Sequence, residues 1–281
     1  MAANKSVPKR KVFFYRDVDS PRGGKLSNFL GGPMKFTSVI VALFISVSAL
    51  AQVTRDVLTN NNRKVVGMDN TKLVDANMLS IPFKYRDIAE SVGLMSMGCT
   101  GTHIGNGLVI SAGHCFEAGK IARYRSTCDG IQVFWNVREG RQPSGVSNCR
   151  QLLVLELNNQ KDYALFRVDN PPRASVKIRA VGRPPLGTRV TIFSHPFKNP
   201  LTWSGTCEIT RAINFGLPAQ AIHHNCDTNP GSSGAAIVDA VSLEVVGIHG
   251  GGVSKGQSGA NYATYIDWTY IPAVLQRLGY R

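Results

Sequence analysis

The sequence contains no internal repeat and no low-complexity tract, which excludes solenoid and fibrous architectures. It has no dense run of basic residues and neither zinc-finger nor helix-turn-helix spacing, although its formal net charge is +14. Residues 1–51 hold eight Lys/Arg and two Asp/Glu, which leaves a net charge of +8 on the rest of the chain. This scattered excess indicates a basic surface, and nucleic-acid binding is the weaker alternative. We therefore expect no nucleic-acid partner.

The sequence also lacks an apolar run of the about 20 residues that a membrane-spanning helix needs. The apolar stretch 39–50 is shorter; it follows Met34-Lys35 and is closed by Ser48-Ala49-Leu50-Ala51. A basic start, a short apolar run and an Ala-x-Ala end are typical of a secretory signal peptide, here residues 34–51. We expect a secreted or periplasmic protein with no stable membrane anchor, a signal anchor being the alternative. Residues 1–33 are then an untranslated or disordered extension.

All six cysteines follow this segment, and an even number in an exported chain predicts disulfide bonds. The sequence alone leaves their connectivity open. A metal site is the competing interpretation of His223, His224 and Cys226. These residues are too closely spaced, with no second Cys-x-x-Cys partner, to hold a metal ion. We therefore expect no metal site.

Short apolar runs of strand length recur along the chain, separated by Gly, Asn or Pro. They lie at residues 107–110, 131–135, 152–155, 163–168, 189–193, 235–238 and 244–248. This spacing favours an all-β sandwich or barrel over alternating β-α units. The proline-rich stretch 170–185 is the candidate linker between two β-subdomains.

Near the end of the chain, four large apolar residues recur at helical spacing: Trp268, Ile271, Leu275 and Leu278. They predict a short C-terminal helix packed on the second subdomain. Pro272 must then lie in the first turn of that helix or precede it.

Three residues far apart in the chain follow the order of a His-Asp-Ser catalytic triad: His114, Asp162 and Ser233. A serine hydroxyl is a poor nucleophile until an imidazole takes its proton, and the imidazole needs a carboxylate to hold its tautomer. His114 follows an apolar run, and Asp162 directly precedes one. The rival carboxylates Asp129 and Asp169 do not combine a position after His114 with a directly following apolar strand. A structural histidine and an aspartate that merely begins a strand are the alternatives.

Ser233 lies in the segment Asn229–Ala235, next to Gly234 and two residues after Gly231. These glycines allow a sharp turn and a close approach of substrate. The backbone N–H groups of Gly231 and Ser233 are candidates for an oxyanion hole, where each donor contributes about 3 kcal/mol. Pro230 has no N–H group, but it occupies neither donor position. An ordinary surface turn is the alternative, which the following strand and the histidine motif make weaker.

Several motifs carry a resemblance to one family. Cys99-Thr100-Gly101-Thr102 and Ser111-Ala112-Gly113-His114-Cys115 resemble the trypsin superfamily. Asp227-Thr228, Gly247-Ile248-His249-Gly250-Gly251 and Asn261-Tyr262-Ala263-Thr264 are similar to its bacterial glutamyl endopeptidase branch. The resemblance runs from Val65 to the C-terminus, strongly at the triad motifs and loosely between them. It implies an all-β, chymotrypsin-like fold of two antiparallel six-stranded β-barrels, with the triad in the cleft between them.

The resemblance also implies boundaries for a protease domain at residues 65–281. The N-barrel would take about 65–168, the linker 169–186, and the C-barrel with its terminal helix 187–281. Proximity in the chain and this fold suggest three disulfide bonds: Cys99–Cys115, Cys128–Cys149 and Cys207–Cys226.

The segment Val65–Asn70 resembles the mature N-terminus of the glutamyl branch. Arg63-Lys64 precedes it, so residues 52–64 are a candidate propeptide, a plain N-terminal tail being the alternative. In trypsin-like enzymes the released α-amine pairs with an aspartate just before the nucleophile, but Ser232 occupies that position here. In glutamyl endopeptidases the amine instead helps to bind the substrate carboxylate.

By resemblance, Thr228 and His249 match residues that bind a glutamate side chain in the primary specificity pocket. Asp227 lies where a trypsin-like pocket carries the carboxylate that selects Lys or Arg. Members of the glutamyl branch can also carry an aspartate there, so we expect cleavage after Glu or Asp. Cleavage after Lys or Arg is the alternative.

These features predict a secreted serine endopeptidase that needs no cofactor and acts as a monomer on protein or peptide substrates. In this hypothesis Ser233 attacks the peptide carbonyl, His114 transfers the proton and Asp162 orients His114. An alternative of another class is a protease-like binding protein without turnover, which the intact triad disfavours.

Overall fold

A computed structural model of the chain describes residues 69–116, 123–211, 220–255 and 258–280. The predicted signal peptide, the extension before it, the propeptide and the new N-terminus at Val65 lie outside these residues. No helix within the described ranges combines the length and hydrophobicity needed to cross a membrane.

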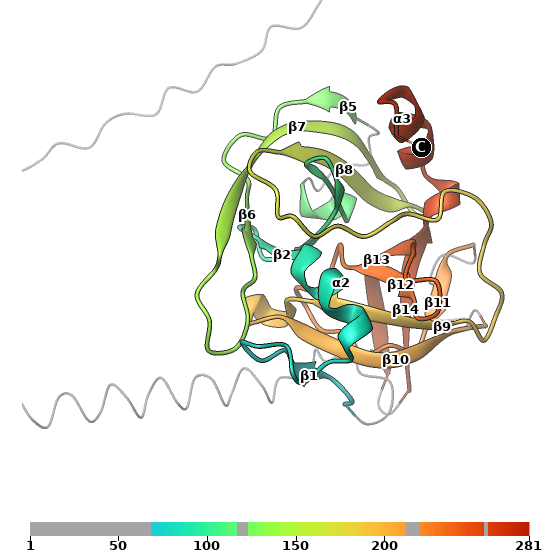
Figure 1. Cartoon of the computed structure of the whole chain (residues 1–281). Coiled ribbons are helices and arrows are strands. Elements are labelled where there is room, and N and C mark those ends of the chain that lie inside the picture. Colours follow the sequence, from blue (N-terminus) through green and yellow to red (C-terminus); the bar gives the residue numbers. More distant parts are fainter. Residues whose placement is uncertain (1–68, 117–122, 212–219, 256–257, 281) are drawn as a thin grey trace, which may run out of the picture. The chain divides into compact units, whose positions relative to one another are not determined.

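The first barrel is an antiparallel ring that runs in the order β7-β6-β2-β3-β4-β8 and is closed by pairing of β8 with β7. A seventh strand, β5, pairs with the edge of β7. These strands are β2 (Val92–Met95), β3 (Thr100–Gly105), β4 (Leu108–Ser111), β5 (Arg123–Ser126), β6 (Gln132–Trp135), β7 (Gly145–Leu157) and β8 (Asp162–Val168). Figure 1 shows this barrel in green, above the second one.

The second barrel is also an antiparallel ring, in the order β10-β11-β14-β13-β12-β9, closed by pairing of β9 with β10. Its strands are β9 (Arg189–Ser194), β10 (Thr202–Thr210), β11 (Ile222–His224), β12 (Ala236–Asp239), β13 (Val245–Lys255) and β14 (Ser258–Tyr265). The short strand β1 (Lys72–Leu73) adds to β10. The two six-stranded barrels predicted from the sequence are confirmed, and this architecture is chymotrypsin-like.

The start of the described chain lies with the second barrel. The family resemblance places residues from about 65 in the N-barrel, whereas β1 pairs with β10 of the second barrel. Two helical segments, η1 (Phe83–Tyr85) and α2 (Arg86–Ser91), then lead into β2.

Strands β4 and β8 of the first barrel bury both faces, because the second barrel covers one of them. Leu108 and Ile110 of β4 belong to the core between the barrels, whereas Val109 between them belongs to the interior of the first barrel. The same alternation holds in β8 for Leu165 and Phe166. Since neighbouring side chains of a strand face opposite sides, each strand serves two cores, and full burial of one such side chain contributes about 1.5–3 kcal/mol.

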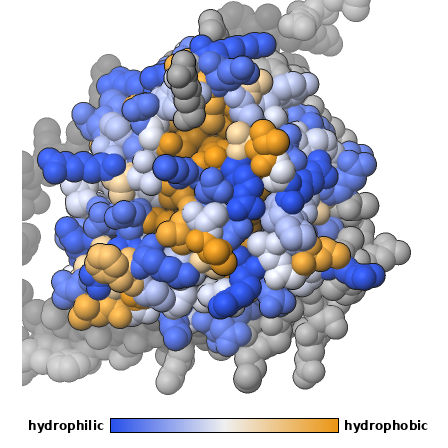
Figure 2. Space-filling model, turned by 45° about the vertical axis from the view of Figure 1, so that its right-hand side comes forward, coloured by the Kyte–Doolittle hydropathy of each residue, from blue (hydrophilic) through white to orange (hydrophobic). Residues whose placement is uncertain are grey.

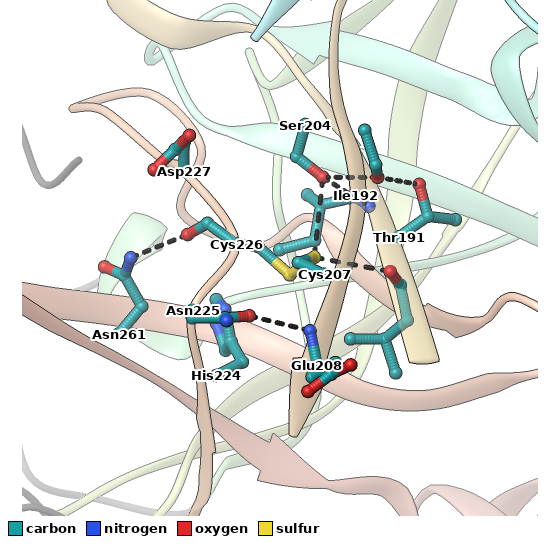
Figure 3. The surroundings of a disulfide bond; sticks show 12 residues. Thr191, Ile192, Ser204, Cys207, Glu208, His224, Asn225, Cys226, Asp227 and Asn261 are labelled. Atoms are coloured by element: carbon teal, nitrogen blue, oxygen red, sulfur yellow. Dashed lines mark hydrogen bonds between the residues drawn. A yellow bond between two sulfur atoms is a disulfide. The ribbon is translucent and has the colours of Figure 1, made fainter. Parts of the chain in front are cut away.

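All three predicted disulfide bonds are confirmed: Cys99–Cys115, Cys128–Cys149 and Cys207–Cys226. The first attaches the chain before β3 to the short helical turn η2 (Gly113–Cys115). The last joins β10 to the segment that follows β11 (Figure 3).

The linker between the barrels is held by backbone hydrogen bonds to both of them. Val176 N–H donates to His103 O of the first barrel over 3.0 Å, and Arg179 N–H donates to Val245 O of the second over 3.0 Å. The His103 ring reinforces the first attachment, because its Nδ1 lies 2.7 Å from Ala174 O.

The C-terminal helix α3 (Ile271–Arg277) has Pro272 in its first turn, as predicted. Trp268 lies in a preceding short turn, η4 (Ile266–Trp268). The helix contacts η4 and β7 of the first barrel, so the expectation that it packs on the second barrel is wrong. Figure 1 shows it beside β5 and β7. Ile271 is fully buried in the core shared by the barrels, and this burial holds the helix against the first barrel.

The surface on one side of the molecule is mostly hydrophilic, with hydrophobic residues gathered near the centre of that face (Figure 2). A groove between the linker and α3 is lined partly by Ile178, Val181 and Leu275.

Candidate active site

His114 and Asp162 form a two-point contact across the first barrel. Nδ1 of the His114 ring lies 2.6 Å from Asp162 Oδ2, and the backbone N–H of His114 donates to Asp162 Oδ1 over 2.9 Å. The aspartate side chain is 8% exposed and the histidine side chain 38% exposed. A carboxylate that accepts from Nδ1–H leaves the Nε2 lone pair available, as a general base requires.

Local sequence explains why this contact forms. Asp162 is the first residue of β8, directly after the tight connection from β7. His114 lies in η2, which follows β4 and is pinned by the Cys99–Cys115 disulfide. A Cβ at Gly113 would lie 2.7 Å from Glu156 O and 3.2 Å from Asp162 Oδ1. Glycine therefore lets the histidine turn lie against the β7–β8 connection.

The second barrel also holds Asp162. The Asp162 N–H donates to Thr264 Oγ1 over 3.0 Å, and the same hydroxyl lies 3.3 Å from Asp162 O. Burial, with a smaller effect of the Asp162 charge, raises the pKa of Tyr262. Of the rival aspartates, Asp129 is exposed and Asp169 pairs with Arg150 at the surface.

The turn around Ser233 lies against the strand that leads to His114. Thr100 N–H of β3 donates to Ser233 O over 2.9 Å, and Ser111 Oγ donates to Thr100 O over 2.8 Å. A Cβ at Gly234 would overlap with Ser111 Oγ and lie 2.8 Å from Ala112 N. The backbone of Ser233 and Gly234 is therefore packed against residues just before the histidine turn.

The geometry around Ser233 leaves two backbone donors available. In the described part of the chain, neither Gly231 N–H nor Ser233 N–H is used in a hydrogen bond. The carbonyl groups of the turn, in contrast, are bonded: Ser232 N–H donates to Asn229 O over 2.9 Å, and Thr100 Oγ1 donates to Gly231 O over 2.8 Å. Two unused donors in a turn with fixed carbonyls form the arrangement that an oxyanion hole needs.

Within the described residues, the His114 ring has one hydrogen bond, to Asp162, and none to the half-buried Ser233. The contact between nucleophile and base is commonly long or poorly aligned when no substrate is bound. The structure thus joins two members of the predicted triad directly and places the third on a neighbouring turn.

Asp227, one of the predicted specificity residues, is held by the N-terminal part of the described chain. It is 5% exposed, and its Oδ2 accepts a hydrogen bond from Asn70 N–H over 2.9 Å. It follows Cys226 of the disulfide to Cys207, which fixes this segment to β10 (Figure 3).

Thr228, the second specificity residue, is bonded to Asn261 of β14. Thr228 Oγ1 donates to Asn261 Oδ1 over 3.0 Å, and Asn261 Nδ2 donates to Cys226 O over 2.8 Å. Figure 3 shows Asn261 reaching toward the carbonyl of Cys226.

His249, the third specificity residue, pairs with a histidine that the sequence analysis considered only as a metal ligand. His249 Nδ1 lies 3.2 Å from His224 Nε2, and both rings are buried. Burial, together with the neighbouring His223, lowers the pKa of His224 to about 3, so its ring is neutral. When His224 Nε2–H is the donor, His249 carries its own proton on Nε2. Its pairing joins β11 to β13, which no local pattern in the sequence indicates.

One cluster of potential metal ligands occurs in the described residues: Cys99, His114 and Cys115. Its two sulfur atoms are joined in a disulfide, so they offer no thiolate to a metal ion. The cluster is part of the histidine turn already described.

Two closed barrels, with an aspartate–histidine pair beside a glycine-rich serine turn, define a chymotrypsin-like hydrolase scaffold. The family model for the trypsin-like peptidase domain matches residues 99–248, more than half of the chain. The chain therefore belongs to this family.

Two solved structures align with the chain, and the first of them has the same fold. A Glu endopeptidase, solved in complex with MPD, aligns with a TM-score of 0.55 at 20% sequence identity, covering 75% of this chain and 98% of that one. The Rv3671c protease in an inactive form aligns with a TM-score of 0.48 at 18% identity, covering 69% and 92% of the two chains. No curated protein matches the chain.

Proposed function

We propose that the protein is a serine endopeptidase in which Ser233 is the nucleophile, His114 the general base and Asp162 the residue that orients His114. The observation that carries this proposal is the 2.6 Å contact between His114 Nδ1 and Asp162 Oδ2 beside the Ser233 turn. Membership of the trypsin-like peptidase family supports it.

In this mechanism the Asp162 carboxylate keeps the His114 proton on Nδ1, so that Nε2 removes the proton of the Ser233 hydroxyl. The serine oxygen then bonds to the peptide carbonyl carbon, and the negative charge on the carbonyl oxygen is met by the N–H groups of Gly231 and Ser233. His114 passes the proton to the leaving amine, and water, activated by the same ring, releases the acyl group. Apart from the substrate and the water of deacylation, each step uses only side chains and backbone N–H groups of this chain.

A fluorophosphonate probe tests the nucleophile. We expect labelling of the processed protein at Ser233 and none in Ser233→Ala. Ser147→Ala is the matched control, because it removes a buried hydroxyl of the first barrel that accepts from Trp135 Nε1 over 2.7 Å. Its labelling should persist. An unlabelled but folded wild-type protein would support the binding protein without turnover.

We further propose that the enzyme prefers Glu or Asp on the amino side of the cleaved bond. Asp227 is buried and its Oδ2 accepts a hydrogen bond from Asn70 N–H, so this oxygen is engaged within the chain and not left to a substrate lysine or arginine. His249 contacts the neutral His224 through Nδ1, and its Nε2 can donate to a substrate carboxylate when the substrate replaces the present contacts of the ring. Thr228 can assist when its hydroxyl exchanges Asn261 for the substrate.

Cleavage-site profiling on a peptide library tests this preference. We expect cuts after Glu and Asp, and a loss in His249→Gln of about 10- to 100-fold in kcat/KM for glutamyl substrates, as for one charge-assisted hydrogen bond. Fluorophosphonate labelling of His249→Gln should change little, because the probe has no side chain for the pocket. Cuts after Lys or Arg would instead support the trypsin-like alternative.

Export and processing are part of the proposal. The candidate signal peptide at 34–51 and three disulfide bonds support a secreted or periplasmic protein. Asn70 lies five positions after Val65, a span of at most about 18 Å, so an amine at Val65 is within reach of the specificity residues. N-terminal sequencing of the exported product should begin at Val65. We propose a monomer acting on peptide or protein substrates, which light scattering during turnover would test.

A further inference from the structure

Within the residues that the structure describes, the residue before the proposed nucleophile has no charged partner. Ser232 is 1% exposed, and its Oγ lies 2.9 Å from Oγ of the buried Ser194 at the end of β9. The Ser232 hydroxyl also accepts from Asn229 N–H over 3.3 Å. These side-chain partners of Ser232 in the described chain are neutral, so no carboxylate stands here to receive an inserted ammonium group.

The peptide bond between Pro230 and Gly231 is oriented by the segment that follows Ser194. Phe197 N–H donates to Pro230 O. The described chain has no cis peptide bond, so the Gly231 N–H points away from Phe197, opposite to the Pro230 carbonyl. Phe197 itself has left-handed backbone angles, with φ 55° and ψ 25°, which a non-glycine residue rarely adopts.

Further contacts of the turn come from the same segment and from β3. His195 N–H donates to Thr100 Oγ1 over 3.0 Å, and that hydroxyl donates to Gly231 O over 2.8 Å. A Cβ at Gly231 would overlap with His195 O and lie 2.9 Å from Phe197 N. The nucleophile turn is thus packed against the segment Ser194–Phe197 and hydrogen-bonded to it.

We propose that Ser194 and Ser232 form a neutral hydroxyl pair that, with the Phe197 N–H, holds the nucleophile turn in its oxyanion-binding conformation without an inserted N-terminal amine. This inference rests on the proposed function, since it assigns Ser194 and Ser232 as positioning residues for Gly231 N–H and Ser233. Release of a new N-terminus then serves substrate binding or exposure of the site, and the turn is already formed before it.

The test measures the second-order rate of fluorophosphonate labelling, which reports on Ser233 and the oxyanion hole independently of the specificity pocket. We expect Ser232→Ala and Ser194→Ala each to lower this rate and kcat about 10- to 100-fold, with KM within threefold, as for weakened oxyanion donors. The labelling rate of the double variant should be no more than about threefold below that of the slower single variant, because the two hydroxyls act as one unit. Ser147→Ala, which loses a buried hydroxyl elsewhere, should retain the wild-type rate.

A pH profile separates positioning from a purely structural role. A free α-amine titrates at about pH 8, and pairing with a carboxylate raises that pKa. We expect the wild-type labelling rate to rise from acid pH to a plateau and then stay level to pH 10, with the variants reaching a lower plateau at the same midpoint. Thermal unfolding shows whether each variant is folded. If Ser232→Ala does not fold, the test relies on Ser194→Ala.

The outcomes are distinct. Labelling rates of both single variants within threefold of wild type would overturn the hydroxyl pair while leaving the peptidase in place. A wild-type plateau that collapses between pH 8 and 10 would show that an amine is required, and would also overturn it. No labelling of wild-type Ser233 at any pH would refute the proposed function and this inference together.

Discussion

Both oxygens of the Asp162 carboxylate are bonded to one residue, His114. Oδ2 lies 2.6 Å from the ring Nδ1, and Oδ1 accepts the backbone N–H over 2.9 Å. The carboxylate therefore fixes the position of the histidine backbone and the tautomer of its ring at the same time.

Asp162→Asn should separate these two effects. An asparagine can keep the bond from the His114 N–H with its oxygen, but its amide nitrogen then faces Nδ1 and donates to it. The ring proton would move to Nε2, which can no longer act as a base. We expect kcat to fall by about 10⁴-fold with little change in thermal stability. Steady-state kinetics at pH 8 measures this.

The control for that experiment is Asp169→Asn, at a surface carboxylate that pairs with Arg150. Its kcat should match the wild type. An Asp162→Asn enzyme within tenfold of wild-type activity would remove Asp162 from the proposed mechanism.

Loss of the Cys99–Cys115 disulfide should affect stability and activity together. The bridge closes a loop of 16 residues that carries the histidine turn. A loop of this size contributes about 3 kcal/mol to the free energy of unfolding, and its release also loosens His114. The Cys99→Ala/Cys115→Ala variant should show an earlier urea midpoint and a reduced kcat.

The matched control is Cys128→Ala/Cys149→Ala, which opens a loop of 21 residues away from His114. We expect a similar shift of the urea midpoint with kcat retained. Equal losses of kcat in both variants would mean that the first bridge has no specific effect on the histidine.

Gly231→Ala should abolish turnover. Gly231 has φ +102°, and a Cβ there would overlap with His195 O. The turn would have to move, and the proposed oxyanion donor would move with it. Gly140→Ala is the control, since Gly140 also has a positive φ, +72°, but nothing lies within 4 Å of its Cβ position.

In this pair both variants pay the conformational cost of a positive φ, about 1–2 kcal/mol. Fluorophosphonate labelling should disappear only in Gly231→Ala. Normal labelling of a folded Gly231→Ala protein would contradict the assigned oxyanion hole.

The stability of the folded protein should fall at acid pH because of a buried histidine. Burial lowers the pKa of His195 to about 4, with its Nδ1 3.0 Å from Asn199 O. In the unfolded chain the His195 side chain titrates near pH 6.5. Below that pH the unfolded chain therefore binds more protons than the folded chain. The contribution of His195 to the free energy of unfolding is complete above pH 6.5. It is lost as the pH falls toward 4, at up to about 1.4 kcal/mol per pH unit.

Urea unfolding at pH 7.5, 6, 5 and 4.5 measures this loss. His195→Asn, which keeps an amide donor but does not titrate, should show a shallower dependence on pH. Parallel curves for the two proteins would mean that His195 does not supply the effect.

The sequence patterns predicted the strands that are rich in large apolar side chains, because these face a core on at least one side. The runs at 163–168 and 189–193 correspond closely to β8 and β9. The strands β10 and β14 were not predicted, since their sequences are rich in Gly, Ser, Thr and Asn. Partners distant in the chain stabilise them, as when Asn261 of β14 bonds to Cys226 O.

The candidate site shows the same division. His114 and Asp162 could be predicted because each stands at the end of an apolar run, and the structure joins them directly. The residues that shape the serine turn could not, since Thr100 reaches Gly231 across 131 residues of chain. Contacts of that kind arise only when the two barrels have assembled.

Asp162 belongs to one barrel, yet its backbone N–H and C=O both meet the Thr264 hydroxyl of the other. The position of the proposed proton-transfer pair therefore depends on correct docking of the two barrels. A fragment carrying residues 69–168 alone would keep its histidine and carboxylate but lose the support that sets their position. Loss of docking between the barrels would then also abolish the proposed catalysis, and a partly assembled chain would not cleave the proteins around it.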